Sequence, residues 1–377
     1  MAHSYTPGLR VTDSATLIRE RRLPLKGDVL VGLGDRVTSE QVVARCELPG
    51  NVQTLNIASR LSVDPPNVGS TLRVPIGSAV KKGDVLAAAR SLFGLVTNTV
   101  TAPTDGVLES ISSITGQLIL REPPIPVEVN AFVDGTVREV IPDEGVVVET
   151  RAAFLQGIFG IGGETWGEIV VAVTGPDQDL EVAHLKSEHR GKVVVGGSYV
   201  SYAALTRARE LGVAAVVVGG FDDRDLRQLL GRDLGVAITG SEELGITLVL
   251  TEGFGRIRMA ERSWKLLTRY AGHAASVSGA TQIRAGVMRP EILIAHDRAE
   301  SASAGAGAGG AEHGLEVGSL LRVIREPHFG RIGNVIELPS DLKELESEAK
   351  VRVLVVEFAD DHSRVVVPRA NVELIAS

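Results

Sequence analysis

The sequence predicts a multidomain α+β fold with a β-rich N-terminal half, a Rossmann-like layered α/β domain and a small C-terminal β-barrel. The first half alternates short apolar runs with Gly-Asp, Asp-Gly and Pro turn signals and has almost no helical periodicity. From residue 192 to about 294, continuously apolar runs alternate with amphipathic helical patterns, which is typical of β-α repeats. From residue 315 onward, short strands separated by glycine and proline return.

Composition narrows the class of protein. A chain of 377 residues that is 44% hydrophobic and 23% charged can bury several cores. The single cysteine, Cys46, excludes an internal disulfide and any multi-cysteine metal site, which suits a reducing cytoplasm. No stretch approaches a membrane span, so we expect a cytoplasmic protein. A net charge of −8 argues against a general polyanion binder.

We expect five consecutive segments. They are an N-terminal arm (residues 1–25), a β-rich region (26–175), an α/β domain (185–296), a linker (297–314) and a C-terminal barrel (315–377). The run from Ser301 to Gly310 contains only Ser, Ala and Gly. Such a run has no apolar area to bury, and it predicts a flexible tether.

Two phrases recur in the β-rich region. Gly27-Asp28-Val29-Leu30, with Gly34-Asp35-Arg36-Val37 after it, is echoed by Gly83-Asp84-Val85-Leu86, and Thr104–Ile111 is echoed by Val133–Val140. Both members of the second pair contain Asp-Gly between alternating apolar residues, which is the strongest short-range signal for a hairpin. The region therefore contains an internal repeat of turn-and-strand units.

These phrases resemble the barrel-sandwich hybrid of biotinyl and lipoyl carrier domains, where a Gly-Asp turn precedes the hairpin that bears a modified lysine. Between Asp84 and Asp105 this chain has no lysine, so a swinging-arm cofactor has no attachment point. We expect no cofactor. Non-carrier proteins use the same fold, among them the ion-translocating oxidoreductase subunit RnfC and the large subunits of RNA polymerase.

The α/β domain is predicted from buried parallel strands, which are apolar throughout rather than alternating. Strands are expected at Val193–Val195, Ala214–Val218, Val236–Ile238 and Thr247–Leu250, and helices at Ser201–Leu211, Asp222–Leu230 and Met259–Ala271.

Glycines that follow these strands allow a close approach of the backbone to a ligand at the strand ends. The candidate residues for this crevice are Gly196, Gly197, Ser198, Gly219, Gly220, Gly253, Gly255 and Gln282. The alternative is that the glycines form tight strand-to-helix turns, with Asp222 as an N-cap. Glu252 is the only acid-base candidate there, and no histidine or cysteine spacing indicates a metal site.

A basic stripe follows the last predicted strand. Its members are Arg256, Arg258, Arg262, Lys265, Arg269, Arg284 and Arg289. The spacing of Arg258, Arg262, Lys265 and Arg269 places them on one face of a helix, opposite Trp264 and Leu267. Such a face can bind RNA or another phosphate ligand, or it can be an ordinary solvated helix surface.

The C-terminal segment contains Val317–Val323, a turn at Pro327–Gly330 and apolar runs that end in Val365–Ile375. It resembles the KOW module of NusG-type elongation factors and some ribosomal proteins. The resemblance implies a small barrel that docks on RNA, RNA polymerase or the ribosome. From residue 315 onward there are eight Lys and Arg against eleven Asp and Glu, which favours a protein surface over RNA. The expected docking residues are Phe329, Gly330 and Gly333.

The sequence thus favours a non-catalytic cytoplasmic adaptor for the transcription or translation machinery. Two alternatives stay open. One is a small-molecule-binding enzyme or sensor that uses the α/β crevice, and the other is a structural subunit of a redox complex.

The absence of a lysine between Asp84 and Asp105 generates a prediction. Protein isolated from its native host is expected to have the intact mass of the unmodified chain, because no amine is present on this hairpin for an amide-linked cofactor. Intact-mass spectrometry checks this, and a mass increase that matches biotin or lipoate on this segment would contradict it.

Overall fold

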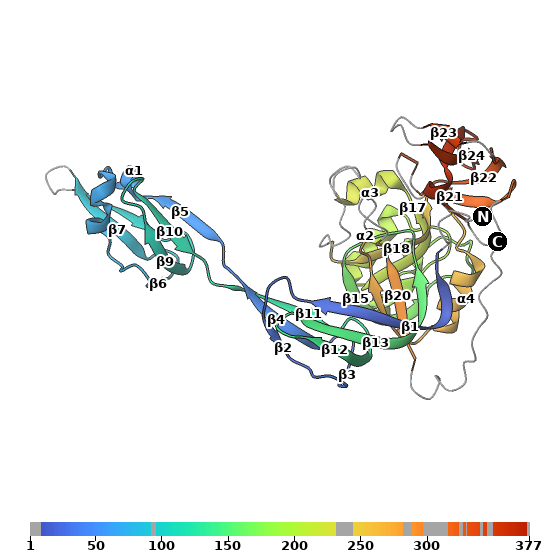
Figure 1. The fold of residues 1–377 in the computed structure, drawn as a ribbon, viewed down its shortest axis with the longest axis horizontal. Helices are drawn as coiled ribbons and strands as arrows, with labels where there is room; N and C mark the ends of the chain where they lie inside the picture. The colour runs from blue at the N-terminus through green and yellow to red at the C-terminus, as the bar shows by residue number, and fades with distance from the viewer. Residues whose placement is uncertain are drawn as a thin grey trace.

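The computed structural model describes residues 9–91, 96–230, 244–281, 288–296, 316–323, 327–328, 330–339, 342–344 and 350–374. The fold is β-rich α+β, as predicted. Figure 1 shows an elongated molecule with a head (residues 51–121) at one end, a β stalk in the middle, and an α/β body at the other. The C-terminal module (residues 316–374) lies on the body. No helix in the described ranges is long and apolar enough to cross a membrane.

The head is a compact β unit with its own core. One sheet has the order β5-β10-β9-β6, and the hairpin β7-β8 forms a second sheet. Leu86, Leu108, Leu118 and Leu120 are fully buried between them, with Ile57 from the short helix α1. The head elements are β5 (Val52–Asn56), α1 (Ile57–Leu61), β6 (Ala79–Val80), β7 (Val85–Ser91), β8 (Val96–Thr101), β9 (Gly106–Ile111) and β10 (Gln117–Arg121).

The Gly-Asp turn of the head recurs in the stalk at Gly34-Asp35, whereas Gly27 lacks the positive φ of this turn. In the stalk, the Asp35 carboxylate accepts from the backbone N–H of Gly32 at 2.7 Å, and in the head Asp84 accepts from Lys81 at 2.8 Å. The glycine before each aspartate has a positive φ, +85° at Gly34 and +94° at Gly83. A residue with a Cβ rarely adopts this conformation, so the repeat of Gly-Asp is explained by its backbone geometry.

The stalk sandwiches a sheet of order β11-β4-β2 against one end of the main sheet. Val43, Phe132, Val137 and Val148 are almost fully buried between these layers. Gly50 and Glu122 form the neck to the head, where a Cβ on Gly50 would lie 1.9 Å from the Glu122 carbonyl oxygen. The stalk strands are β2 (Asp28–Val29), β3 (Arg36–Val37), β4 (Val42–Leu48), β11 (Ile125–Asn130) and β12 (Gly135–Ile141).

Strand β13 (Gly145–Gln156) joins stalk and body in one continuous sheet. Its first half pairs with β12 of the stalk and its second half with β20 (Glu291–Ala295) of the body. Along its other edge it pairs with β1 (Val11–Arg22), which lies in the predicted N-terminal arm. The main sheet has the order β14-β18-β17-β16-β15-β19-β20-β13-β12-β3, so it runs across the expected boundary near residue 175.

The body contains the predicted β-α alternation. Strands β15 (Glu164–Val171), β16 (Val193–Val195), β17 (Ala215–Phe221) and β18 (Thr247–Phe254) are parallel, and β16, β17 and β18 are buried on both faces. Helices α2 (Tyr202–Leu211) and α3 (Asp223–Leu230) cover one face, and α4 (Glu261–Arg269) covers the other. The sheet is completed by β14 (Phe159–Ile161) and β19 (Ala274–Ser278). The strand expected at Val236–Ile238 lies outside the described residues.

The ends of α2 show why these predictions hold. The Ser201 side chain accepts from the N–H of Ala204, and Gly212, with a φ of +74°, ends the helix.

The C-terminal module is antiparallel and forms a half-barrel. Its strands are β21 (Leu320–Val323), β22 (Ile332–Glu337), β23 (Leu342–Glu344), β24 (Lys350–Phe358), β25 (Arg364–Pro368) and β26 (Val372–Leu374).

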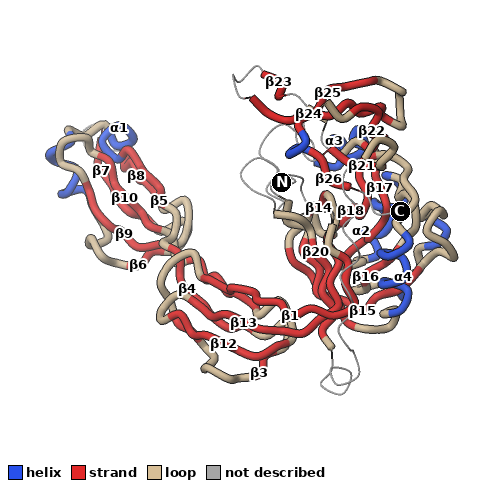
Figure 2. Tube along the Cα trace, turned by 45° about the vertical axis from the view of Figure 1, so that its right-hand side comes forward, coloured by secondary structure: helices blue, strands red, loops and turns tan. Residues whose placement is uncertain are grey.

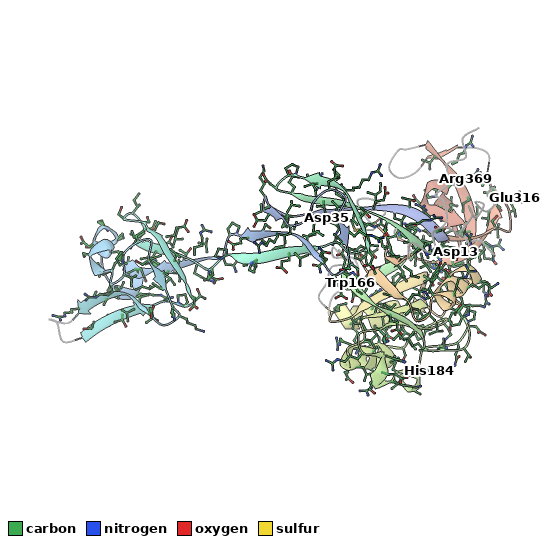
Figure 3. The ribbon with its side chains drawn as sticks, turned by 90° about the horizontal axis from the view of Figure 1, so that it is seen from below. Asp13, Asp35, Trp166, His184, Glu316 and Arg369 are labelled. Carbon is green, nitrogen blue, oxygen red and sulfur yellow. The ribbon has the colours of Figure 1, made fainter. Side chains whose placement is uncertain are left out.

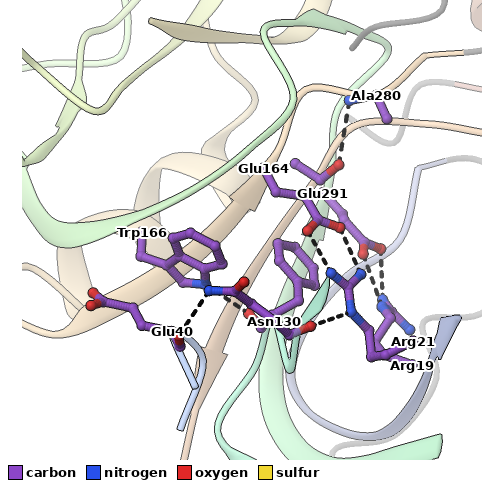
Figure 4. A network of polar contacts seen from close by, with 10 residues as sticks. Arg19, Arg21, Glu40, Asn130, Glu164, Trp166, Ala280 and Glu291 are labelled. Atoms are coloured by element: carbon purple, nitrogen blue, oxygen red, sulfur yellow. Dashed lines mark hydrogen bonds and ion pairs between the residues drawn. The ribbon is translucent and has the colours of Figure 1, made fainter. Parts of the chain in front are cut away.

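A network of ion pairs fixes the joint between stalk and body (Figure 4). From β1, Arg19 makes two hydrogen bonds to Glu291, and Arg21 makes two to Glu164 at 2.7 Å each. Beside them the indole N–H of Trp166 donates to the Phe132 carbonyl at 3.0 Å. Figure 3 shows Trp166 where the stalk meets the body. Burial raises the pKa of Glu291 above 4.5, and the neighbouring Arg19 opposes this shift only in part.

The raised pKa makes the joint sensitive to pH. Where the unfolded chain has released the Glu291 proton and the folded chain still holds it, the free energy of unfolding falls as pH rises above about 4.5. Glu291→Gln is expected to remove this fall, because the amide does not titrate. Urea unfolding at several pH values checks it, with Glu144→Gln, an exposed partner of Arg22, as the control. A parallel pH dependence in Glu291→Gln and the parent protein would contradict the assignment.

Candidate functional site

The candidate site is the edge of the body sheet at which the parallel strands β16, β17 and β18 end. In α/β proteins this edge is where ligands bind, in the space above the carboxyl ends of the strands. Here the chain itself occupies the space next to the predicted glycines. A Cβ on Gly197 would lie 2.3 Å from the Gln178 carbonyl oxygen, and one on Gly219 would lie 2.0 Å from that of Ile257.

The other predicted glycines show the same pattern with one exception. A Cβ on Gly196 would meet side chains of Val218 and Leu180 at 2.8 and 2.9 Å, and one on Gly220 would lie 2.0 Å from the Gly255 carbonyl oxygen. Gly255 itself has a φ of +102° and open space around it. The close approach that these glycines permit is therefore between segments of this chain.

Ser198 is buried and holds one of these covering segments. Its hydroxyl donates to the Asp179 carboxylate at 2.6 Å and lies 2.9 Å from the Asp177 carbonyl oxygen. Only 3% of the residue is exposed. These contacts explain Ser198 as an anchor for residues 175–180.

Glu252 is the buried carboxylate of the site. One of its oxygens accepts from the backbone N–H of Ala260, the N-cap of α4, at 2.9 Å. The other accepts from the guanidinium of Arg322, in β21 of the C-terminal module, at 3.0 Å. The Glu252 side chain is 7% exposed and the Arg322 side chain 2%. The predicted acid-base candidate is thus one half of a buried ion pair between the body and the module.

Gly330 completes the contact between module and body. A Cβ on Gly253 would lie 2.6 Å from the Gly330 carbonyl oxygen, and a Cβ on Gly330 would lie 2.8 Å from the Phe254 ring. Both glycines have positive φ, +148° and +81°. Figures 1 and 2 show the module above the ends of β17 and β18. Gly330, which was expected to dock on a partner, here contacts the protein's own body.

The other predicted docking residues have different outcomes. Gly333 lies in β22, where its missing side chain lets Glu357 and Val356 of β24 approach closely. Phe329 lies outside the described residues, as do Gln282 and Arg284. Sequence reasoning missed Arg322. The available signal was a single arginine within the apolar run from Leu320 to Ile324.

A polar cluster lies beside the covered edge. Arg256 forms an ion pair with Asp179, and its guanidinium lies 5.1 Å from the centre of the Tyr199 ring. The Tyr199 hydroxyl is 3.4 Å from the Asp225 carboxylate. Burial, with smaller effects from Asp225 and Asp222, raises the pKa of Tyr199 to about 12. The phenol therefore stays protonated at neutral pH, and Arg256 is engaged within the body.

The basic stripe has acidic and carbonyl partners in the fold. Arg258 and Lys265 both pair with Glu261, at 2.8 and 3.4 Å. Strand β1 supplies Asp13 to Arg269 at 2.6 Å and the Val11 carbonyl to Arg262 at 3.0 Å. The hydrogen bonds from its two cations, Arg258 first, lower the pKa of Glu261.

This geometry favours the structural interpretation of the stripe. Helix α4 begins at Glu261, so Arg258 precedes it and does not share its face. Arg262 and Arg269 connect α4 to β1, while Arg289 lies apart, in the turn before β20. In the described part of the chain, no group of three or more His, Cys, Asp or Glu side chains could hold a metal ion.

Comparison with known proteins adds no assignment, since neither a protein-family model nor a curated protein matches this sequence.

The contact at Gly330 can be tested with a matched pair of glycines. Asn tolerates positive φ, so Gly330→Asn adds bulk against Phe254 without forcing the backbone. We expect it to displace the module and to destabilise the protein by about 1–3 kcal/mol. Small-angle scattering should show a larger radius of gyration, and thermal unfolding a lower midpoint.

The control is Gly318→Asn, which has a similar φ of +91° and no atom within 4 Å of the added Cβ. It should leave both quantities unchanged. If Gly330→Asn gives the same radius of gyration as Gly318→Asn, the module is not held through this contact.

Proposed function

We propose that this protein is a non-catalytic adaptor. One observation carries the proposal: the sheet edge at which an α/β enzyme would bind its ligand is covered by the protein's own backbone and C-terminal module. The buried Arg322–Glu252 pair and the Gly330–Gly253 contact hold that cover. A carboxylate that is buried and bonded on both oxygens is a poor candidate for acid-base chemistry, because its lone pairs already have partners.

The shape of the molecule supports the same proposal. The head has its own core and is separated from the body by the stalk, so the two ends can bind different partners (Figure 1). We interpret the β-rich region of residues 26–175 as a barrel-sandwich hybrid, from the Gly-Asp turn that occurs in both the stalk and the head. We interpret the body as Rossmann-like, from its parallel strands with helices on both faces. The C-terminal half-barrel we interpret as KOW-like. On that resemblance, the proposed partners are RNA polymerase or the ribosome.

Two other interpretations have less support. An enzyme or sensor would need space above β16 and β17, and the covering segments take up that space at Gly197, Gly219 and Gly220. A role of the α4 face in binding RNA or phosphate would need its cations to leave Glu261 and Asp13. The interpretation as a structural subunit of a redox complex is supported only by the turns that resemble those of RnfC.

The test is affinity purification of the tagged full chain from its native host, with and without nuclease. We expect a protein partner that stays bound after nuclease treatment. Denaturing the purified protein should release no small molecule in stoichiometric amount, as measured by mass spectrometry. A metabolite or nucleotide retained at one per chain, with no protein partner, would overturn the adaptor proposal.

A matched variant without the head sharpens the test. Because Leu48 of β4 pairs with Ile125 of β11, residues 49–124 can be replaced by Asn-Gly, which closes a two-residue hairpin there. The stalk and body keep their own cores, so they should stay folded. Under the proposal this variant loses the partners that bind the head and retains those that bind the body.

A further inference from the structure

The C-terminal module is held on the body by a specific contact. Arg322 supplies polar contacts between them: its guanidinium reaches Glu252 at 3.0 Å and the Thr251 carbonyl at 3.5 Å. Gly330 packs closely against Gly253 and Phe254. These contacts fall on the short body sequence Thr251-Glu252-Gly253-Phe254.

Each position of this segment has a defined requirement. The carboxylate of Glu252 neutralises a guanidinium that is 2% exposed, and a buried charge without a partner is costly. The next residue must be glycine, because any Cβ would lie 2.6 Å from the Gly330 oxygen. The residue after this glycine, Phe254, places its aromatic ring against Gly330. The module thus fits a carboxylate, a glycine and an aromatic residue in sequence.

The sequence that connects the body to the module has little apolar area. Between His296 and Glu316 it is dominated by Ala, Gly and Ser, a composition that predicts a flexible tether. A partner segment of the same chemistry competes with the body segment on equal terms, apart from the higher effective concentration of the tethered one.

We propose that this surface of the module is an autoinhibited binding site for an acidic protein segment of the type Glu-Gly-aromatic, and that Glu252-Gly253-Phe254 occupies it in the closed protein. The partner is a protein segment rather than a nucleic acid, because acidic residues outnumber basic ones from residue 315 onward, eleven to eight. The inference rests on the proposed adaptor function and identifies what one of its surfaces recognises.

The test uses the full chain and a fluorescein-labelled peptide with the sequence of residues 250–256. Glu252→Gln keeps the oxygen that accepts from Ala260 and removes the charge that holds Arg322. Because the peptide then meets less competition, the apparent affinity should rise about tenfold or more over the parent chain. Adding Arg322→Gln to this variant should abolish binding, and so should a peptide with Gln in place of Glu or Ala in place of Gly.

Circular dichroism and thermal unfolding establish that each variant is folded. If Glu252→Gln is not folded, Glu252→Asp replaces it, because the shorter carboxylate cannot reach both Ala260 and Arg322. Arg364→Gln, which removes an exposed ion pair of the same module, is the matched control and should leave peptide binding unchanged.

Three results would overturn the inference. The peptide could bind Glu252→Gln no more tightly than the parent, binding could survive the loss of Arg322, or a short RNA could bind the opened protein in place of the peptide. Each is distinguishable from failure of the adaptor proposal, since the affinity purification would still recover a protein partner through other surfaces.

Discussion

The arrangement of the site depends on one buried carboxylate, that of Glu252, which needs hydrogen-bond donors and an opposite charge around it. Glu252 lies near the end of β18. Its carboxylate accepts a hydrogen bond from the N–H of Ala260, the N-cap of α4, and pairs with Arg322 of the C-terminal module. A charge removed from water must be compensated by hydrogen bonds and an opposite charge. Its position therefore fixes a strand, a helix and a separate module relative to one another. The glycines around it follow from this, because such close packing leaves no room for a Cβ.

Local features of the fold could be predicted from the sequence, and long-range pairings could not. The parallel strands and the three body helices follow from apolar runs, helical periodicity and residues such as Ser201 and Gly212 at helix ends. The continuous sheet depends instead on β13 pairing with strands far away in the chain on both edges, for example with β20 near residue 293. No local pattern specifies such a neighbour, so the β-rich half and the α/β domain looked separable.

The contacts of the candidate site were also not predictable, because they too join segments that are far apart in the sequence. A glycine that permits close approach has the same sequence signal whether a ligand or a carbonyl of the chain approaches it, as at Gly197 and Gly219. The basic stripe seemed unpaired because Asp13, the partner of Arg269, lies 256 positions away. Arg322 is visible as an arginine in an apolar strand, but only the fold shows that its partner is Glu252.

The hairpin insertion of the head has a mechanical consequence. Both ends of the head leave through the neck, where Glu122 bonds to Asn51 and Gln53, and continue into the paired strands β4 and β11. A pull on the head along the stalk loads both strands in the same direction, so their mutual hydrogen bonds carry no shear. The load passes instead to the stalk core and then to β13, a single strand that pairs with both stalk and body and so transmits the tension into the body.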